Sequence, residues 1–381
     1  MLVLSWHKGK NESAGPFFKT LSNLLCMKIL IVISNMFAGG AQRVVSRLAN
    51  SLSADNDVMI MTFHTDRSFP LSEKIRMFYF HEPSLHDYSR YGSFFVSLRN
   101  EIRTLALSRQ LRKIKKEVKP DVSISFLDNP NLLNALSGGR VRIMSERNNP
   151  RSKGKAYYYH ELLAFLFADK IVFQTNSVKN MFPFYIRRKG VVLPNPVQVE
   201  CAAVGGSKKI VTMGRHHPQK NHELLIRAFA KFSDTHPSHT LHIYGKDYGD
   251  ARLETLIERM GLTGKVFLEG FRDDVHEAVS DAEQFVLSSD YEGTPNALLE
   301  AMMMGLPCIS TDFEGVREML GGSEACRLVP VGDELGLAEA MNAFADDEVL
   351  RRGYSERGMR LAEEYSLDIV IPRWRSLLFR Q

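Results

Sequence analysis

The sequence predicts two tandem, doubly wound α/β domains, and three observations support this fold class. The chain has 381 residues, which at about 150 residues per domain corresponds to two or three domains. Short apolar runs alternate with helical patterns along most of the chain, as expected of parallel sheets covered by helices. Two prolines interrupt this alternation within 193–196, and it restarts at Lys209, so we place a linker between these points.

The first domain is predicted to span 27–198. It opens with a buried strand over 28–34, a glycine-containing turn and a helix over 41–52. Four further apolar runs have the length and bounding residues of strands: 58–63, 121–126, 141–145 and 170–174. Residues 1–26 carry no clear signal-peptide pattern, and we interpret them as an extension that is either disordered or a mis-assigned start.

The second domain is predicted to span 199–364 and repeats the same alternation. Its predicted strands are 209–213, 240–244, 265–268, 284–288 and 307–310. Helices are predicted over 222–232, over 252–260 and from about Pro295. In doubly wound sheets ligands bind beyond the carboxyl ends of the strands, so two such domains predict a site in the cleft between them.

Composition excludes several classes of protein. With 44% hydrophobic and 24% charged residues, the chain is neither collagen-like nor largely disordered. Its longest apolar runs fall far short of the roughly 20 residues that cross a bilayer. The four cysteines form no C-x-x-C pair, which disfavours a disulfide framework or a structural zinc site and fits a reducing cytosol.

The positive charge is concentrated in one segment. The net charge is +5, and 99–119 contains eight basic and two acidic residues. Apolar residues recur there at helical spacing: Leu98, Ile102, Leu105, Leu111, Ile114 and Val118. Such a helix can have a solvated basic face, lie on an anionic membrane or bind nucleic acid. We favour the membrane, and the lack of interleaved aromatic residues argues against nucleic acid.

Gly39 and Gly40 follow the first strand and open a helix. Glycines there let the backbone approach a phosphate closely, and the start of a helix favours an anion. A tight strand–helix turn explains the same residues equally well, and the complete G-x-G-x-x-G fingerprint is absent.

The loop 214–221 carries Arg215 and Lys220 after a predicted strand. Two cations in that position suit a diphosphate, because Arg offers planar donors and Lys a point charge. A solvated basic loop is the alternative. His216 and His217 suggest a metal, but no third ligand lies at metal-binding spacing, so we favour phosphate.

The segment 289–300 is the richest in functional signals. Thr294 is predicted to cap a helix in which Pro295 occupies the first turn. The backbone amides of Asn296 and Ala297 would then be free to bind an anion. Glu292 and Glu300 are acceptors suited to sugar or ribose hydroxyls. Their spacing is informative only together with Gly293 and the helix, since 44 acidic residues produce several such pairs by chance.

These blocks occur in order with several others along the chain. The further blocks are Ile243-Tyr244-Gly245-Lys246-Asp247, Val266-Phe267-Leu268-Glu269-Gly270, Glu300-Ala301-Met302 and Gly305-Leu306-Pro307. In this combination 27–381 resembles family 4 of the retaining nucleotide-sugar glycosyltransferases, which have the GT-B fold. The resemblance implies that a C-terminal helix over 366–379, carrying Trp374 within a segment 365–381, packs back on the first domain.

The resemblance also implies roles for individual residues. As catalytic residues, Arg215 and Lys220 would hold the donor diphosphate and stabilise its leaving charge, while Glu292 would contact the donor sugar. The implied donor-binding residues are Gly39, Gly40, Gly214, Gly270, Gly293, Thr294, Pro295, Asn296, Ala297 and Glu300. Among these, Glu300 would bind the ribose hydroxyls and Gly270 would line the base pocket. Fixed cations and a helix start can stabilise the leaving group, so we expect no metal or other cofactor.

One position departs from the family. Many relatives carry a histidine after the strand that corresponds to 141–145, whereas this chain has Arg147 there. We assign Arg147, with the cations of the basic helix, to acceptor or membrane binding. Those cations are Arg103, Arg109, Arg112, Lys113 and Lys116.

The resulting hypothesis is a cytoplasmic hexosyltransferase on the inner face of the inner membrane. It would transfer a hexose or N-acetylhexosamine from a UDP-sugar to a polyprenyl-diphosphate-linked oligosaccharide, in O-antigen or other surface polysaccharide biosynthesis, without binding nucleic acid. Two alternatives stay open at this point: a nucleotide-sugar epimerase of the same fold, and a non-catalytic membrane scaffold that binds sugar nucleotides.

Overall fold

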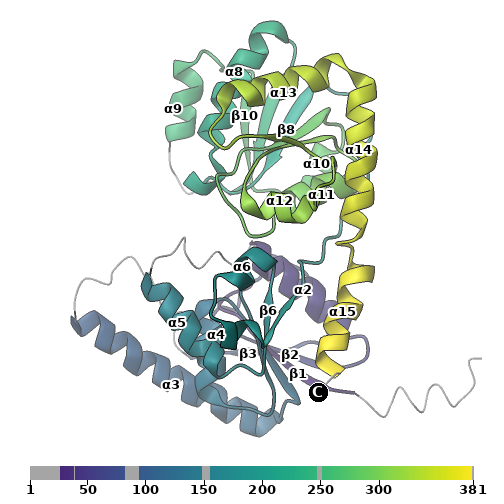
Figure 1. The fold of residues 1–381 in the computed structure, drawn as a ribbon. Helices are drawn as coiled ribbons and strands as arrows, with labels where there is room; N and C mark the ends of the chain where they lie inside the picture. The colour runs from purple at the N-terminus through teal and green to yellow at the C-terminus, as the bar shows by residue number, and fades with distance from the viewer. Residues whose placement is uncertain (1–25, 38, 82–93, 148–154, 247–250, 380–381) are drawn as a thin grey trace, which may run out of the picture.

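The protein consists of two α/β lobes stacked end to end (Figure 1). The structure is a computed structural model, and it describes residues 26–37, 39–81, 94–147, 155–246 and 251–379. All but the last residue of the predicted extension 1–26 lie outside these residues, as does Asp247. A parallel sheet forms the centre of each lobe, which confirms the predicted fold class.

The N-terminal lobe is built on a seven-stranded sheet of order β3-β2-β1-β4-β5-β6-β7. Its elements are β1 (Lys28–Val32), α2 (Gly40–Leu52), β2 (Asp57–Thr62), β3 (Arg76–Tyr79), α3 (Phe94–Val118), β4 (Val122–Phe126), α4 (Asp128–Ser137), β5 (Arg142–Ser145), α5 (Lys155–Leu166), β6 (Lys170–Phe173), α6 (Asn176–Asn180), α7 (Phe184–Arg187) and β7 (Gly190–Val192). The strand order reverses between β1 and β4, so the switch point of this sheet lies at their carboxyl ends.

The C-terminal lobe is built on a six-stranded sheet of order β10-β9-β8-β11-β12-β13. Its elements are β8 (Lys209–Met213), a 3₁₀ turn (Pro218–Lys220), α8 (His222–Thr235), β9 (Thr240–Tyr244), α9 (Arg252–Arg259), β10 (Val266–Gly270), α10 (Val275–Val279), β11 (Gln284–Leu287), α11 (Asn296–Met304), β12 (Cys308–Thr311), α12 (Glu314–Leu320), β13 (Arg327–Val329), α13 (Glu334–Asp346) and α14 (Glu348–Glu363). Here the switch point lies between β8 and β11.

The chain crosses between the lobes twice, and the two crossings touch. The first follows β7, and the second leads from α14 into α15 (Leu367–Phe379). The amide of Val197 donates to the carbonyl of Tyr365 at 2.8 Å, and Val197 forms an isolated parallel bridge with Ser366. Figure 1 shows α15 beside α2 of the N-terminal lobe, where Trp374 is fully buried in the core.

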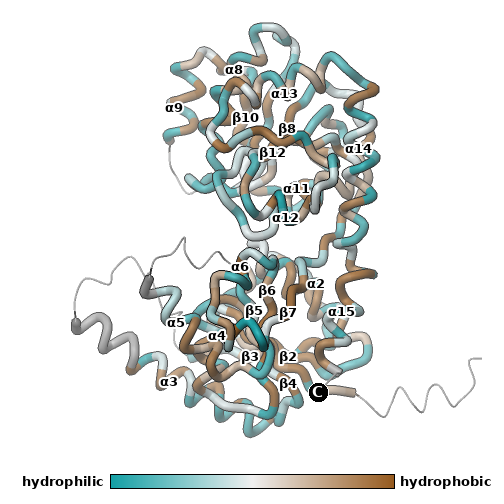
Figure 2. The backbone as a smooth tube through the Cα atoms, viewed as in Figure 1, coloured by the Kyte–Doolittle hydropathy of each residue, from teal (hydrophilic) through white to brown (hydrophobic). Residues whose placement is uncertain are grey.

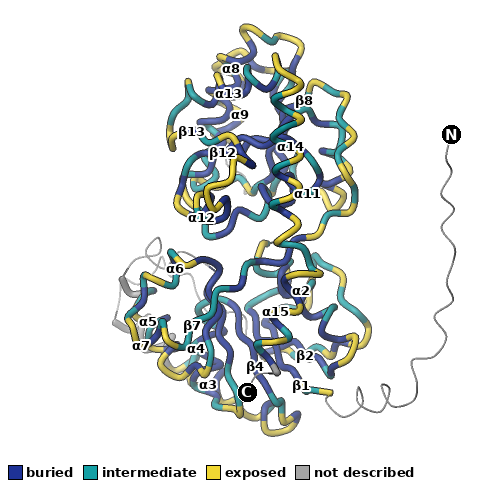
Figure 3. The backbone as a smooth tube through the Cα atoms, turned by 45° about the vertical axis from the view of Figure 1, so that its right-hand side comes forward, coloured by how far each residue is buried: buried dark blue, intermediate teal, exposed yellow. Residues whose placement is uncertain are grey.

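Each sheet is buried on both faces, so its strands are apolar and its covering helices carry the polar surface (Figures 2 and 3). Three short edge strands, β3, β7 and β13, were not among the predicted strands. They have three or four residues each and are partly exposed. They therefore lack the apolar runs on which strand prediction rests.

Candidate functional site

The two loops at the switch point of the C-terminal lobe are joined by hydrogen bonds. The amide of Asp290 donates to the carbonyl of Gln219 at 2.9 Å, and Gln219 Nε2 donates to the carbonyl of Tyr291 at 2.7 Å. Asn221 Nδ2 donates to Asp290 Oδ1 at 2.8 Å. Asn221 has a left-handed backbone and also caps α8 through its side chain. The loop after β8 is therefore held against the loop after β11.

This junction brings Lys220 and Glu292 together. Lys220 Nζ lies 2.7 Å from Glu292 Oε1, and the Ser289 hydroxyl donates to the same oxygen at 2.7 Å. Both charged side chains are largely buried, with 14% and 11% of their surface exposed. Arg215 lies on the same loop and is exposed. The structure thus places the three predicted catalytic residues at one end of the sheet, with two of them in contact.

The neighbouring loops approach this loop very closely. A Cβ atom on Gly245 would lie 1.9 Å from the carbonyl oxygen of Gly214, so only glycine fits after β9. Gly270 ends β10 with a φ of +71°, and its carbonyl accepts the Gly245 amide at 2.8 Å. Gly214 and Gly270, both predicted donor-binding residues, therefore both contact the backbone at Gly245.

The start of α11 differs from the prediction. Thr294 does not cap the helix: Pro295 occupies the cap position, and no side chain caps it. The Thr294 amide instead donates to Gln174 Oε1 of the N-terminal lobe at 3.3 Å. The Asn296 amide donates to the Thr294 carbonyl at 3.0 Å, so it is not free for an anion as predicted. Pro295 has a φ of −77° and a ψ of 82°, so the residue before the helix is not helical.

The N-terminal lobe meets the start of α11 through residues that follow β1, β6 and β7. Asn195 Nδ2 donates to Asn296 Oδ1 at 2.8 Å. A Cβ on Gly40, the first residue of α2, would lie 3.1 Å from Asn296 Nδ2. A Cβ on Gly293 would lie 2.5 Å from Gln174 Oε1. Gly40 and Gly293 thus lie where the lobes approach each other closely, and Gly39 directly precedes α2.

Glu300 is paired across the lobe interface. Arg43 Nη1 lies 2.6 Å and 2.7 Å from the two carboxylate oxygens, and Arg47 Nη2 lies 3.4 Å from one of them. His276 Nε2 lies 3.6 Å from the other oxygen. Burial raises the pKa of Glu300, but His276 and the two arginines outweigh it and lower the pKa to about 2. Glu300 is therefore ionised and enclosed.

Arg147 is not part of a membrane-facing surface, contrary to the prediction. It is 8% exposed and donates a hydrogen bond to Asn195. Its guanidinium carbon lies 5.1 Å from the ring centre of Phe126 and 5.7 Å from that of Trp374. Burial lowers the pKa of Arg147 to about 9, against the opposing charge of Glu146. The side chain supports the interlobe linker from inside the core.

The basic helix α3 is only partly as predicted. Ile102 and Leu105, predicted to share its apolar stripe, are 61% and 47% exposed, whereas Leu111 is buried. Arg112 donates to the carbonyls of Ser137 and Leu136 at the end of α4. Arg109, Lys113 and Lys116 are exposed, and Arg103 is half-buried. The cations therefore do not form one solvent-facing surface, because Arg112 is hydrogen-bonded to the end of α4.

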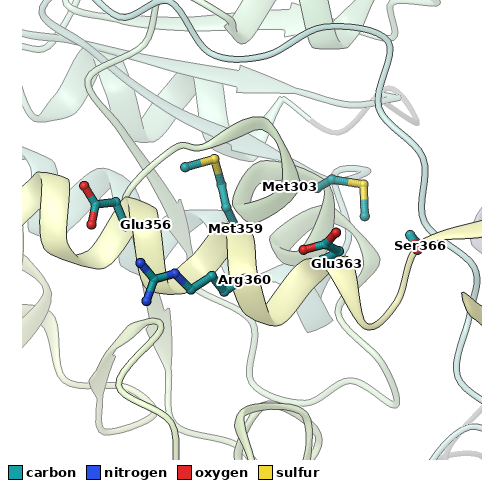
Figure 4. A pocket seen from close by; sticks show the side chains of 6 residues that line it. All are labelled: Met303, Glu356, Met359, Arg360, Glu363 and Ser366. Carbon is teal, nitrogen blue, oxygen red and sulfur yellow. The ribbon is translucent and has the colours of Figure 1, made fainter.

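Two cavities differ in whether they include residues of this site. One of about 360 Å³ lies between α6 and the loops after β11 and β12, and it contains Glu292 in its wall. The other, of about 440 Å³, lies along α14 and contains none of the predicted site residues (Figure 4). We therefore assign the site to the smaller cavity. Over the described ranges, no group of three or more His, Cys, Asp and Glu side chains is placed to bind a metal.

Residues that sequence reasoning missed are mostly interlobe contacts. Arg43 was given no role, although its spacing of four from Arg47 puts both cations on one face of α2. Gln174 and Asn195 had no sequence signal. Glu318 of α12 accepts hydrogen bonds from the amides of Asn176 and Ser177 at the start of α6, and it also had none.

Comparisons with known proteins agree with this geometry. Residues 200–360 match the family model described as glycosyl transferases group 1. The chain is 25% identical over 364 residues (92% of this chain, 98% of the relative) to the Campylobacter jejuni GalNAc-alpha-(1->4)-GalNAc-alpha-(1->3)-diNAcBac-PP-undecaprenol alpha-1,4-N-acetyl-D-galactosaminyltransferase. It is also 25% identical over 365 residues (89% and 95%) to the N-acetylgalactosamine-N,N'-diacetylbacillosaminyl-diphospho-undecaprenol 4-alpha-N-acetylgalactosaminyltransferase of the same organism. Anabaena HepE in complex with UDP and glucose superposes with a TM-score of 0.76 at 16% identity, covering 93% of this chain and 100% of that chain.

The fold and these matches define the class: the chain is a glycosyltransferase with the GT-B fold. The group 1 match covers the lobe that carries Lys220, Glu292 and Glu300. Among the described residues, no helix combines the length and apolar character needed to span a membrane.

Proposed function

We propose that the chain is a retaining, metal-independent glycosyltransferase of surface polysaccharide or glycan biosynthesis. It transfers a hexose or N-acetylhexosamine from a UDP-sugar to an oligosaccharide linked to a polyprenyl diphosphate. The two Campylobacter jejuni relatives, named as acting on undecaprenol-linked sugars, support the acceptor class. The HepE complexes with UDP and UDP-glucose support the nucleotide.

The observation that carries the proposal is the Lys220–Glu292 pair beside the start of α11. A nucleoside diphosphate gains negative charge as it leaves the sugar, and a fixed cation in a partly buried site stabilises that charge. The 2.7 Å contact with Glu292 holds the Lys220 ammonium in place. Arg215, exposed on the same loop, is free to close on the second phosphate. The helix start adds a partial positive charge.

The cavity next to Glu292 supports acceptor binding at the same place. Its lining combines apolar side chains with the carboxylate, as a sugar-binding pocket does. The residues that line it are Ser177, Val178, Met181, Asp290, Tyr291, Glu292, Phe313, Glu314, Gly315 and Val331. Both lobes contribute to this wall, so an acceptor sugar bound there would lie beside the group that contacts the donor sugar.

An exposed apolar patch on the N-terminal lobe supports attachment to the cytoplasmic membrane face. We call it the α5–α7 patch. It consists of Tyr159, Leu163, Leu166, Phe167, Phe184 and Tyr185, each between 46% and 65% exposed. Arg188 is exposed beside it, 5.7 Å from the ring centre of Phe184. Apolar side chains flanked by cations suit an anionic lipid surface, and the patch does so better than the α3 face predicted from sequence.

The activity is tested by incubating the protein with a panel of UDP-sugars and polyprenyl-diphosphate-linked acceptors and measuring UDP release. We expect release with one donor only when a lipid-linked acceptor is present. Glu292→Gln keeps the shape of the side chain and is expected to abolish release, while Glu334→Gln, in an exposed ion pair with Lys231, is expected to leave it unchanged. Conversion of a UDP-sugar without acceptor would contradict the proposal and indicate an epimerase.

Membrane attachment is tested by co-sedimentation with vesicles. The wild type is expected to bind vesicles that contain phosphatidylglycerol and to bind pure phosphatidylcholine weakly. Leu163→Glu with Phe184→Glu is expected to lose binding at least tenfold, because about 2.5–3.5 kcal/mol opposes each charge inserted deeply into lipid. Met260→Glu, at an exposed position of the other lobe, is the control. Equal binding of all three proteins would contradict this surface.

A further inference from the structure

The pairing of Glu300 with Arg43 has a consequence for nucleotide entry, which rests on the proposed function. Glu300 is the carboxylate assigned to the ribose hydroxyls, yet it is only 3% exposed. Both of its oxygens are taken by a single nitrogen of Arg43, at 2.6 Å and 2.7 Å. A carboxylate that already accepts these hydrogen bonds in a closed environment has no open side for a diol.

The two arginines differ in how firmly they are held. Arg47 donates to the carbonyls of Pro196 and Gln198 in the interlobe linker, at 3.1 Å and 2.8 Å, besides contacting Glu300. Within the described part of the chain, Arg43 donates to no backbone carbonyl through its side chain. Its side chain is 27% exposed and lies over the ring of Phe69, 5.4 Å from its centre. Arg43 is therefore the member of the pair that can leave Glu300.

The position of the pair links it to the closure of the lobes. Arg43 lies one turn into α2 of the N-terminal lobe, and Glu300 lies about one turn into α11 of the C-terminal lobe. The starts of these two helices already meet, at Gly40 and Asn296. A partly buried ion pair at this point holds the lobes together, because separating them would strand an enclosed carboxylate without one of its partners.

We propose that Arg43 is a latch that occupies Glu300 in the nucleotide-free protein and is displaced by the ribose diol of the donor. Arg47 stays in place and keeps Glu300 ionised when Arg43 leaves. Arg43 thus positions the carboxylate, and displacing it uses part of the binding free energy of the nucleotide. Only molecules with an open latch bind nucleotide. The apparent affinity is therefore the intrinsic affinity multiplied by the fraction of molecules in which the latch is open.

The latch is tested with Arg43→Gln, measuring UDP binding by calorimetry and the radius of gyration by small-angle X-ray scattering. We expect UDP to bind the variant roughly three- to tenfold more tightly than the wild type, since the competing cation is gone. Without UDP the variant is expected to have a larger radius of gyration than the wild type. Arg76→Gln, which removes an exposed ion pair with Asp57, is the matched control and is expected to behave as wild type.

Weaker UDP binding by Arg43→Gln would overturn the proposal, because Arg43 would then belong to the nucleotide site. An unchanged radius of gyration would also overturn it, because the pair would not hold the lobes. If Arg43→Gln does not fold, Arg43→Lys, which keeps the charge but loses the fork of donors, is expected to give a smaller change in the same directions. Failure of every variant and of the wild type to bind UDP would contradict the proposed function, while the scattering comparison would still test the latch.

Discussion

The two lobes share one sheet topology but use their switch points differently. In the C-terminal lobe the loops after β8 and β11 are hydrogen-bonded to each other, and they hold the Lys220–Glu292 pair within that lobe alone. In the N-terminal lobe the helix after β1 instead reaches across to the other lobe through Arg43, and Gln174 and Asn195, after β6 and β7, do the same. One lobe holds its candidate site residues together by internal contacts, and the other contributes contacts across the lobe interface.

The buried charges show the same difference. In the C-terminal lobe the buried carboxylate of Glu300 lies at the candidate site, whereas the N-terminal lobe also buries charge within its own core. Glu146 and Glu161 are 0% and 1% exposed there, and burial together with the charge of Glu146 raises the pKa of Glu161. Lys115 is buried in the same lobe. The N-terminal lobe therefore encloses charged groups away from the lobe interface, and the comparison can be tested by substitutions in each lobe separately.

The largest expected effect is on the core that receives α15. Trp374 is fully buried beside Phe126, and Trp374→Ala is expected to destabilise the N-terminal lobe by about 3–5 kcal/mol through the cavity it leaves. Hydrogen exchange is expected to accelerate in β1 and α2 and to stay unchanged in β8 and β11. Phe344→Ala, in the core of the other lobe, should give the reverse pattern. Equal acceleration in both lobes would show that they unfold as one unit.

The next largest effect is on catalysis. Lys220→Ala removes the cation held against Glu292, and kcat/KM is expected to fall by about 10²–10³ with thermal unfolding nearly unchanged. Lys231→Ala serves as the control, because Lys231 is exposed and pairs with Glu334. A loss of less than tenfold would show that Arg215 or the start of α11 carries the leaving charge, and it would weaken the division of labour between the lobes.

Local sequence was sufficient to predict the C-terminal half of the site. Lys220 and Glu292 each follow a recognisable strand, and the carboxyl ends of neighbouring parallel strands lie together at one edge of a sheet. The same reasoning placed Gly214 at that edge, whereas Gly270 was assigned by the family resemblance. Each of these residues is positioned by its own loop, so the motif and the fold class together determine where it lies.

Contacts across the lobes could not be predicted in this way. Arg43 and Glu300 are 257 residues apart, and Gln174 and Thr294 are 120 apart. Their pairing depends on how two separately folded sheets face each other, which no local pattern records. The wrong assignment of Thr294 as a cap has the same origin, because its amide is taken by Gln174. Helical spacing in α3 likewise does not show that the end of α4 occupies Arg112.

The smallest effect is a pH dependence confined to the N-terminal lobe. Lys115 Nζ donates to Asn134 Oδ1 at 2.6 Å and to the carbonyl of Gly138 at 2.5 Å. Burial, with the charges of Arg142 and Arg112, lowers the pKa of Lys115 to about 7. Above pH 7 the folded protein has released this proton while the unfolded chain still holds it. The unfolded state then binds more protons, so stability rises with pH.

We therefore compare the wild type with Lys115→Met by urea unfolding, followed by tryptophan fluorescence, between pH 7 and 9. The unfolding free energy of the wild type, minus that of Lys115→Met, is expected to rise by up to about 1.4 kcal/mol per pH unit. Lys113→Met, at an exposed position of the same helix, should show no such slope. Parallel pH profiles for all three proteins would show that Lys115 stays charged when buried, and the N-terminal lobe would then tolerate internal charge as the C-terminal site does.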